Sequence, residues 1–148
     1  MNLRRRGFVT IDINFYASEA FEEGFVFRVP KGICNQQELF SAFAVGLNAP
    51  GRYFGYNWDA FNDCLAMLDW IDSYNVFILH DELPRLSEKE LGIYLDILNG
   101  ASLEWKSTKI HQLNEIYPDM VRHEISIYFP IDLEHDIKNI LKREPLSD

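Results

Sequence analysis

One aromatic and acidic stretch decides how the fold is interpreted: Tyr53-Phe54-Gly55-Tyr56-Asn57-Trp58-Asp59-Ala60-Phe61-Asn62-Asp63-Cys64-Leu65. Its second half predicts a helix over residues 58–71, because apolar side chains recur there at offsets of three, four and seven residues. Those side chains are Phe61, Cys64, Leu65, Leu68 and Ile71. Since this spacing places them on one face of a helix, we expect that face to pack into the core.

The same helix carries two acidic residues, Asp59 and Asp63, which are four positions apart. At this spacing two carboxylates share a helix face and repel each other by about 0.2–0.5 kcal/mol. Asn57 is a good N-cap, and Asp59 would lie in the first turn, where the helix dipole favours an anion. Asp63 gains little from that dipole, so local stability does not account for the pair.

Aromatic residues crowd the approach to this acidic face. Tyr53, Tyr56 and Trp58 precede or begin the helix, and Gly55 lets the backbone turn sharply or approach another segment closely. Tyr and Trp are enriched where partner proteins make their dominant contacts. The residues alone leave two interpretations open, a solvated and well-capped helix start or a surface that docks onto a basic partner protein.

Strand and helix patterns alternate on both sides of this stretch, without a low-complexity linker or a repeat. Apolar or alternating runs predict strands over residues 8–15, 24–30, 75–80 and 124–130. Capping-box starts at Asn35 and Ser87 predict two further helices, of which the first ends before Pro50 and the second can end at Gly100. A charged amphipathic pattern predicts a last helix over residues 132–143.

The composition fits one folded α/β domain over residues 1–148, with 47% hydrophobic and 14% aromatic residues. The formal net charge of -9 would repel nucleic acid, so we expect no nucleic-acid partner. No apolar run approaches a membrane span, and the run after Arg6 is broken before a secretory signal is complete. Cys34 and Cys64 sit among apolar residues, where buried free thiols are expected. A reducing cytoplasm fits best.

The stretch from Tyr53 to Leu65 resembles the signature segment of the barstar family of ribonuclease inhibitors. The shared pattern is Tyr53-Phe54-Gly55-x-Asn57-Trp58-Asp59-Ala60-Phe61-x-Asp63-Cys64-Leu65, and the order of the flanking elements is similar over residues 24–130. The resemblance implies a three-layer α/β fold, in which a small three-stranded parallel sheet packs against helices. An extra N-terminal strand or hairpin and a C-terminal helix would extend this core.

The resemblance also implies roles for individual residues. Asp63 corresponds to an aspartate that enters the ribonuclease's phosphate-binding site, and Asp59 to a second aspartate that faces the same basic site. Tyr53 corresponds to an aromatic residue that packs beside the catalytic histidine, and Gly55 to an interface glycine. The full predicted partner-binding set is Tyr53, Gly55, Tyr56, Asn57, Trp58, Asp59, Asn62 and Asp63. Carboxylates on a rigid helix can occupy a phosphate site without being cleaved.

The sequence departs from the best-known member of that family at several positions. Asn62 stands where that member has a tryptophan, and Tyr56 stands where it has an acidic residue. A further acidic contact of that member has no secure match, because Asn99-Gly100 falls near its place and Glu104 is only a loose candidate. We therefore expect changed partner contacts.

Other candidate sites are weaker. The run His80-Asp81-Glu82 follows a predicted strand, where α/β folds often bind ligands, but ordinary structural roles are favoured. His111, His123 and His135 lack a compact ligand spacing and are expected on the surface or half-buried. Trp70 and Trp105 are expected to be packing residues. No zinc, phosphate-loop or nucleophile motif is present, so we expect no metal, cofactor or catalytic residue.

The favoured interpretation is a cytoplasmic inhibitor or immunity protein, monomeric when free, that occludes the basic active site of a cognate ribonuclease. One alternative is a barstar-like module that binds another basic protein or toxin, which the departures at Asn62 and Tyr56 permit. A second alternative is a small enzyme that uses Asp59 and Asp63. It has weak support, because the helical pair has no base or metal ligand nearby in the sequence.

Overall fold

A parallel β-sheet of four strands forms the centre of the computed structural model, which describes residues 10–18, 23–107, 112, 115–119 and 121–142. The strands are β1 (Asn14–Tyr16), β2 (Phe25–Val29), β3 (Asn75–His80) and β4 (Glu124–Pro130), arranged in the order β1-β4-β3-β2. All three pairings are parallel, and Ile78 of β3 is in register with Phe27 of β2 and Ile127 of β4. The inner strand β3 is buried on both faces, which explains its uninterrupted apolar run.

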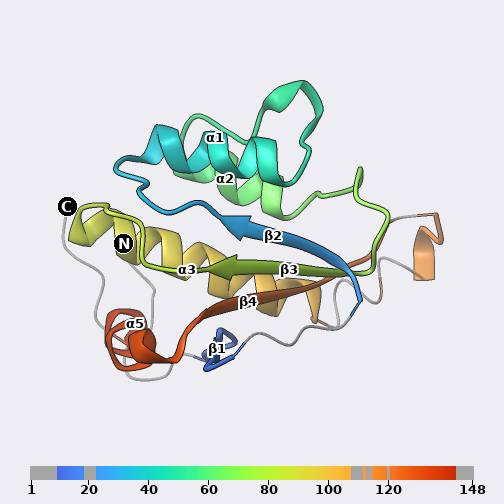
Figure 1. Cartoon of the computed structure of the whole chain (residues 1–148). Helices are drawn as coiled ribbons and strands as arrows, with labels where there is room; N and C mark the ends of the chain where they lie inside the picture. Colours follow the sequence, from blue (N-terminus) through green and yellow to red (C-terminus); the bar gives the residue numbers. More distant parts are fainter. Residues whose placement is uncertain (1–9, 19–22, 108–111, 113–114, 120, 143–148) are drawn as a thin grey trace, which may run out of the picture.

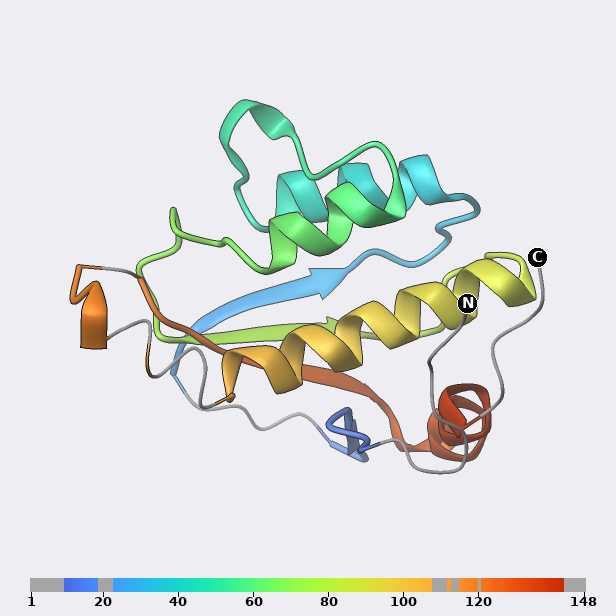
Figure 2. The ribbon, with the colours of Figure 1, turned by 180° about the vertical axis from the view of Figure 1, so that it is seen from behind.

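Helices connect and cover these strands (Figures 1 and 2). They are α1 (Gln36–Gly46), α2 (Trp58–Leu65), α3 (Glu88–Trp105) and α5 (Glu134–Lys142), with short 3-10 helices η1 (Pro50–Arg52) and η2 (Ile131–Leu133). Helices α1 and α2 lie beside each other next to β2, while α3 runs along the sheet and packs on β4 (Figures 1 and 2). The predicted α/β class, with a parallel sheet packed against helices, is confirmed.

The two predicted additions to the three-stranded core are present. β1 joins the sheet as a fourth strand beside β4, and α5 packs against α3 after η2. β1 is shorter than the predicted strand over residues 8–15, whose first two residues lie outside the described part of the chain. The N-terminal segment is also fixed to α3, because Asn99 accepts from the Asp12 amide at 2.7 Å and donates to the Thr10 carbonyl at 2.8 Å.

Two predicted helix ends are wrong. The helix predicted over residues 58–71 ends at Leu65, and Leu68 adopts a left-handed conformation with φ 48° that a helix cannot accommodate. Leu68 and Ile71 are nevertheless buried, so they reach the core from a loop rather than from a helix face. Helix α3 continues past Gly100 to Trp105, because the buried side chains of its last turns outweigh the cost of about 1 kcal/mol for one helical glycine.

Two predictions of burial are also wrong. Cys34 is exposed, since its chain segment forms a turn ahead of α1, and Cys64 is only partly buried; both thiols are free. His123 is almost completely buried, although the sequence predicted a surface or half-buried residue. Trp105 is buried as predicted, and Trp70 packs against the core while its Nε1 donates to the Leu47 carbonyl at 2.8 Å.

The core between the sheet and the first two helices is dominated by aromatic rings. Phe61 of α2 is fully buried and lies within ring-contact distance of Phe40 and Phe43 of α1, with centroid separations of 5.0 and 4.8 Å. Phe54 and Tyr94 complete the surroundings of this ring, at 5.4 and 6.1 Å. Burial of a phenylalanine side chain contributes about 1.5–3 kcal/mol, so Phe61 fixes α2 firmly on the domain.

A buried polar network crosses the carboxyl end of β3. His80 is fully buried and stacks on Phe129 at 3.8 Å. Its Nδ1 lies 3.0 Å from the Tyr128 carbonyl, which can only accept, so Nδ1 donates and Nε2 accepts from the Tyr94 hydroxyl at 2.6 Å. Burial lowers the pKa of His80 to about 3, and it raises the pKa of Tyr94. His80 is therefore neutral in the folded protein.

We predict that protonation of His80 in the unfolded chain lowers the free energy of unfolding as the pH falls. The unfolded chain binds a proton on this ring at its usual pKa of about 6.5, whereas the folded protein does so only near 3. The contribution of His80 is thus complete at pH 7.5, and about 2 kcal/mol of it is lost by pH 5. Urea denaturation of the protein and of His80→Gln across this range measures the effect as the difference between their pH slopes. Identical slopes would contradict it.

Candidate protein-binding site

Helix α2 begins at a well-formed cap. Asn57 has an extended backbone, with φ -146° and ψ 172°, and its side chain accepts from the Ala60 amide at 2.8 Å. This bond satisfies one of the free amides of the first turn, as predicted for Asn57. Asp59 lies in that first turn, near the positive end of the helix dipole.

The helix has a buried face and an acidic face. Phe61 and Leu65 are fully buried, whereas Asp59, Asn62 and Asp63 are exposed. Offsets of three and four residues place these three polar side chains on one outward stripe. In the described part of the chain, neither carboxylate has a cationic partner within salt-bridge distance, so the stripe presents two uncompensated negative charges.

Cys64 marks the border between the two faces. Its side chain is partly buried against the core, and burial, followed by the negative charge of Asp63, raises the pKa of its thiol. The thiol therefore stays protonated and neutral at physiological pH, and it is a poor nucleophile and metal ligand. Its role in this structure is packing.

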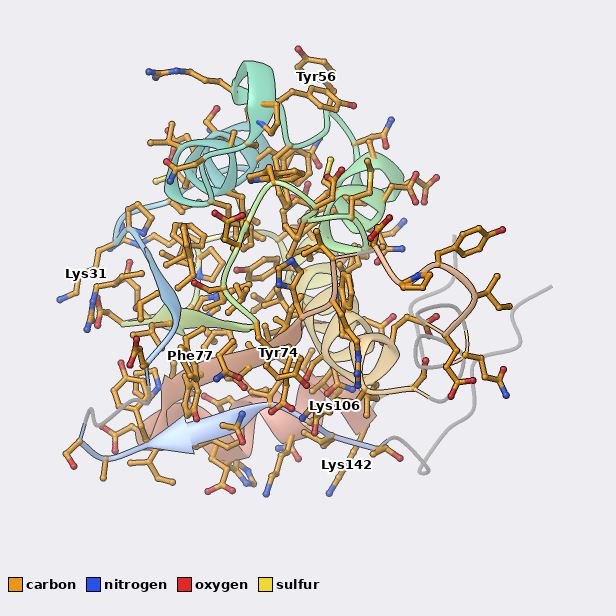
Figure 3. The ribbon with its side chains drawn as sticks, turned by 90° about the vertical axis from the view of Figure 1, so that its right-hand side faces the viewer. Lys31, Tyr56, Tyr74, Phe77, Lys106 and Lys142 are labelled. Atoms are coloured by element: carbon orange, nitrogen blue, oxygen red, sulfur yellow. The ribbon has the colours of Figure 1, made fainter. Side chains whose placement is uncertain are left out.

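Two tyrosines stand beside the start of the helix. Tyr53 is 42% exposed and Tyr56 is 81% exposed, and their rings meet edge to face at 5.0 Å. Figure 3 shows Tyr56 projecting from the end of the molecule opposite Lys142. An edge-to-face contact stabilises an aromatic pair by about 0.5–1.5 kcal/mol beyond its burial, which helps to hold both rings in place at the surface.

Trp58 differs from the two tyrosines. It is only partly exposed, and its ring packs against Phe40 at 5.1 Å and Phe61 at 5.8 Å. Trp58 thus joins α2 to α1, and any contact it makes with a partner would involve the part of the ring left open to solvent.

The backbone at position 55 requires a glycine. Its φ is 97°, a value that side chains disfavour, and it is buried against the start of α2. A Cβ at this position would lie 2.6 Å from the backbone nitrogen of Phe61 and 2.9 Å from the carbonyl carbon of Ala60. Gly55 therefore lets the chain that carries both tyrosines pass closely over the helix.

The exposed surface extends beyond the predicted residues. Ala66 and Met67 follow Asp63 at offsets of three and four, and both are exposed, with Met67 at 56%. The helical offset from Asp63 was the signal that could have identified them. Arg52, exposed and with φ 53°, precedes the tyrosine pair and is the nearest cationic residue in the sequence.

The two candidates for a further contact, Asn99 and Glu104, differ in their exposure to solvent. Asn99 is buried and its amide is used by the N-terminal segment, so it is not a surface residue. Glu104 is exposed near the end of α3. The neighbouring Trp105 reaches α2, because its Nε1 donates to the Leu65 carbonyl at 3.0 Å.

The residues of the His80-Asp81-Glu82 run have separate structural partners. His80 is buried as described above, Asp81 pairs with Arg28 at 2.5 Å, and Glu82 accepts from the Gly32 amide at 2.8 Å. Within the described ranges, no group of three or more His, Cys, Asp or Glu side chains could hold a metal ion. His135 is exposed on α5, and His111 lies outside the described residues.

Comparison with known proteins gives one match. A family model described as Barstar (barnase inhibitor) matches residues 25–115, which is more than half of the chain. The match includes β2, α1, α2, β3 and α3, and so the whole predicted binding surface. No curated protein and no solved structure matches significantly. Among the described residues, no helix is long and apolar enough to cross a membrane.

We predict that Gly55→Ala destabilises the fold by more than about 2 kcal/mol, because it combines backbone strain with a clash against Phe61 and Ala60. Gly51→Ala is the matched control, since Gly51 also has a positive φ, 66°, but open space around the new Cβ. Gly51→Ala should lower the free energy of unfolding only by the backbone strain, about 1 kcal/mol. Urea denaturation measures both values, and equal losses would show that Gly55 is not needed for close approach.

Proposed function

Because the chain belongs to the barstar family, we propose that it inhibits a ribonuclease by placing the acidic face of α2 in the enzyme's basic active site. The observation that carries this proposal is the pair Asp59 and Asp63, exposed on one stripe of a helix that is capped and packed in place. A ribonuclease must surround the phosphate of its substrate with Arg, Lys and His side chains. Fixed carboxylates form charge-assisted hydrogen bonds with the same groups.

In this proposal the binding surface is divided into parts with different tasks. Asp63, near the middle of the exposed stripe, is the central anchor in the phosphate-binding site, and Asp59 faces the same basic groups. Tyr53 and Tyr56 flank the carboxylates and supply rigid aromatic contacts. Gly55 and Asn57 act by shaping the backbone, and Trp58 by its exposed part.

Two residues set the proposed inhibitor apart from the best-known member of the family. Asn62 offers an amide where that member has a large aromatic ring, and both it and Tyr56 are exposed beside the carboxylates. We infer that the cognate ribonuclease differs from barnase at the positions that meet these side chains. The proposed biological role is that of a cytoplasmic immunity protein, monomeric when free, that protects a cell from its own ribonuclease toxin.

A second candidate function is supported by the same departures. A surface with two carboxylates and an 81%-exposed tyrosine is complementary to any cleft that presents guanidinium groups, since Arg pairs with carboxylates and stacks on aromatic rings. The partner could then be a basic toxin with another activity. Assays of RNA cleavage separate the two functions. A ribonuclease partner loses its activity when the protein binds, whereas a basic toxin with another activity binds the protein and has no RNA cleavage to inhibit.

We predict that Asp63→Ala weakens binding to the cognate ribonuclease by about 30-fold to several thousand-fold, because it leaves the enzyme's buried cations unpaired. The fold should be unaffected, since Asp63 is exposed and repels Asp59. Barnase and ribonuclease domains encoded beside the gene are the enzymes to titrate.

The matched control for this prediction is Asp132→Ala. Asp132 is also exposed, but it lies in η2 after β4, and its loss changes the net charge by the same amount. Inhibition of RNA hydrolysis and calorimetric titration should show near-normal binding for this control. If Asp63→Ala and Asp132→Ala bind equally well, the assignment of Asp63 as the anchor is wrong.

We also predict that the association rate falls about tenfold or more between low salt and 0.5 M NaCl. A protein of net charge -9 is attracted to a basic cleft over long distances, and salt screens that attraction. Stopped-flow fluorescence measures the rate, and the dissociation rate should change much less. An association rate that does not depend on salt would argue against recognition of a basic active site.

A further inference from the structure

Met67 is a large apolar side chain that the fold leaves open to solvent beside the proposed binding helix. It is 56% exposed and lies four positions after Asp63, in the turn that follows α2. Figure 2 shows the chain leaving the end of α2 and running towards the start of β3. Single exposed apolar residues are ordinary on protein surfaces, so exposure alone assigns Met67 no role. The contacts that hold the turn around it are more specific.

The turn directs Met67 outward because its neighbours on both sides are anchored in the core. Leu65 and Leu68 are fully buried. The two residues between them, Ala66 and Met67, are exposed. The Met67 amide donates to the Cys64 carbonyl at 3.1 Å, which closes the turn directly after the helix. The backbone therefore sets the direction of the Met67 side chain.

Leu68 holds this turn in a strained conformation. Its φ of 48° lies in the left-handed region, where a helix commonly ends on glycine. A residue with a side chain disfavours this region and adopts it only where the surrounding structure holds it there. Here the Leu68 side chain is completely buried, and its burial offsets the strain. Strained backbone of this kind is concentrated at binding and catalytic sites.

Two buried residues from other parts of the chain contact the backbone on either side of Met67. The Trp105 indole of α3 donates to the Leu65 carbonyl at 3.0 Å. Nε2 of His123, directly before β4, lies 2.6 Å from the Leu68 carbonyl. The turn that presents Met67 is thus held in place before any partner binds. A side chain on fixed backbone loses less conformational freedom on binding than one on a mobile loop.

Met67 also extends an apolar border around the acidic stripe. Among the described residues, nine large apolar side chains are exposed, and three of them, Tyr53, Tyr56 and Met67, lie between positions 53 and 67. The tyrosines precede the start of α2 and Met67 follows its end, so apolar surface flanks the carboxylates at both ends of the helix. The energetically dominant groups of an interface are commonly surrounded by contacts that exclude water from them.

We propose that Met67 is a specificity-determining residue of the interface, whose side chain inserts into an apolar hollow beside the basic site of the bound ribonuclease. This inference rests on the proposed function and adds a feature of the partner. The partner presents cations to Asp59 and Asp63, and apolar or aromatic side chains at the end that faces Met67. Methionine suits such a hollow, because it is unbranched and its thioether contacts aromatic rings favourably. A ribonuclease with charged groups at this position binds less tightly, since Met67 would exclude water from them.

Calorimetric titration and inhibition of RNA hydrolysis test this contact in the full chain, with barnase and the ribonuclease domains encoded beside the gene. Met67→Ala should weaken binding of the cognate enzyme about 10- to 100-fold, because it removes the apolar contact. Met67→Leu should retain nearly all of the affinity, since it preserves the apolar volume. Ile131→Ala is the matched control. Ile131 is a 44%-exposed apolar residue in η2, after β4, and its variant should bind normally.

Binding kinetics separate this contact from the charge pairs. Met67→Ala should raise the dissociation rate and leave the association rate and its salt dependence unchanged, because the net charge of -9 is preserved. Asp63→Ala, by contrast, removes a steering charge and should also slow association. If the loss caused by Met67→Ala appeared in the association rate instead, the variant would have disturbed the acidic stripe and the proposal would be wrong.

Methionine methyl NMR tests the contact independently of any change in affinity. The chain has three methionines, and Met67→Leu identifies the Met67 signal by its loss. In the free protein this methyl group should be accessible to a soluble paramagnetic probe, and binding of the cognate ribonuclease should protect it. A Met67 methyl group that stays equally accessible in the complex would overturn the proposal.

The results distinguish a failure of this proposal from a failure of the proposed function. If a ribonuclease is inhibited and Asp63→Ala weakens the inhibition, but Met67→Ala binds as tightly as Ile131→Ala, the assignment of Met67 is wrong and the proposed function stands. If no ribonuclease is bound or inhibited, the proposed function fails and the assignment of Met67 fails with it. If Met67→Ala does not fold, the methyl protection of the unaltered protein decides alone.

Discussion

The packing of Phe61 is the constraint on which the rest of the structure depends. This side chain is fully buried among aromatic rings from α1, α3 and the loop before α2, so it determines which face of α2 turns inward. The opposite face must then carry side chains that tolerate water. Aromatic packing thus fixes the direction of Asp59 and Asp63 without any direct contact to either carboxylate.

Much of this arrangement could be predicted from the sequence because it follows from local rules. The Asn57 cap, the inward Phe61 and Leu65 and the outward aspartates all result from helix geometry within one short segment. The central strands were equally clear, because β3 and β4 are uninterrupted or regularly alternating apolar runs. The family match agrees with these elements and with the resemblance of the signature segment.

What could not be predicted depends on contacts between distant segments. Trp105 donates to the Leu65 carbonyl at the end of α2, and His123 contacts the Leu68 carbonyl in the loop that follows. Both residues are far away in the sequence, so an apolar period that continued to Ile71 gave a helix that was too long. Likewise, the side-chain amide of Asn99 is bonded to Asp12 and Thr10 of the N-terminal segment, which is far away in the sequence. Periodicity describes one element at a time and contains no information about such partners.

These tertiary contacts explain how a short helix can present unpaired charges. Eight residues are too few for a stable isolated helix, and two neighbouring carboxylates weaken it further. The Asn57 cap holds the first turn, Phe61 holds the middle, and the Trp105 indole holds the Leu65 carbonyl at the end. A surface fixed at three points loses little conformational freedom when it binds, so more of the electrostatic attraction remains as affinity. The same rigidity that stabilises the fold therefore prepares the acidic face for a partner.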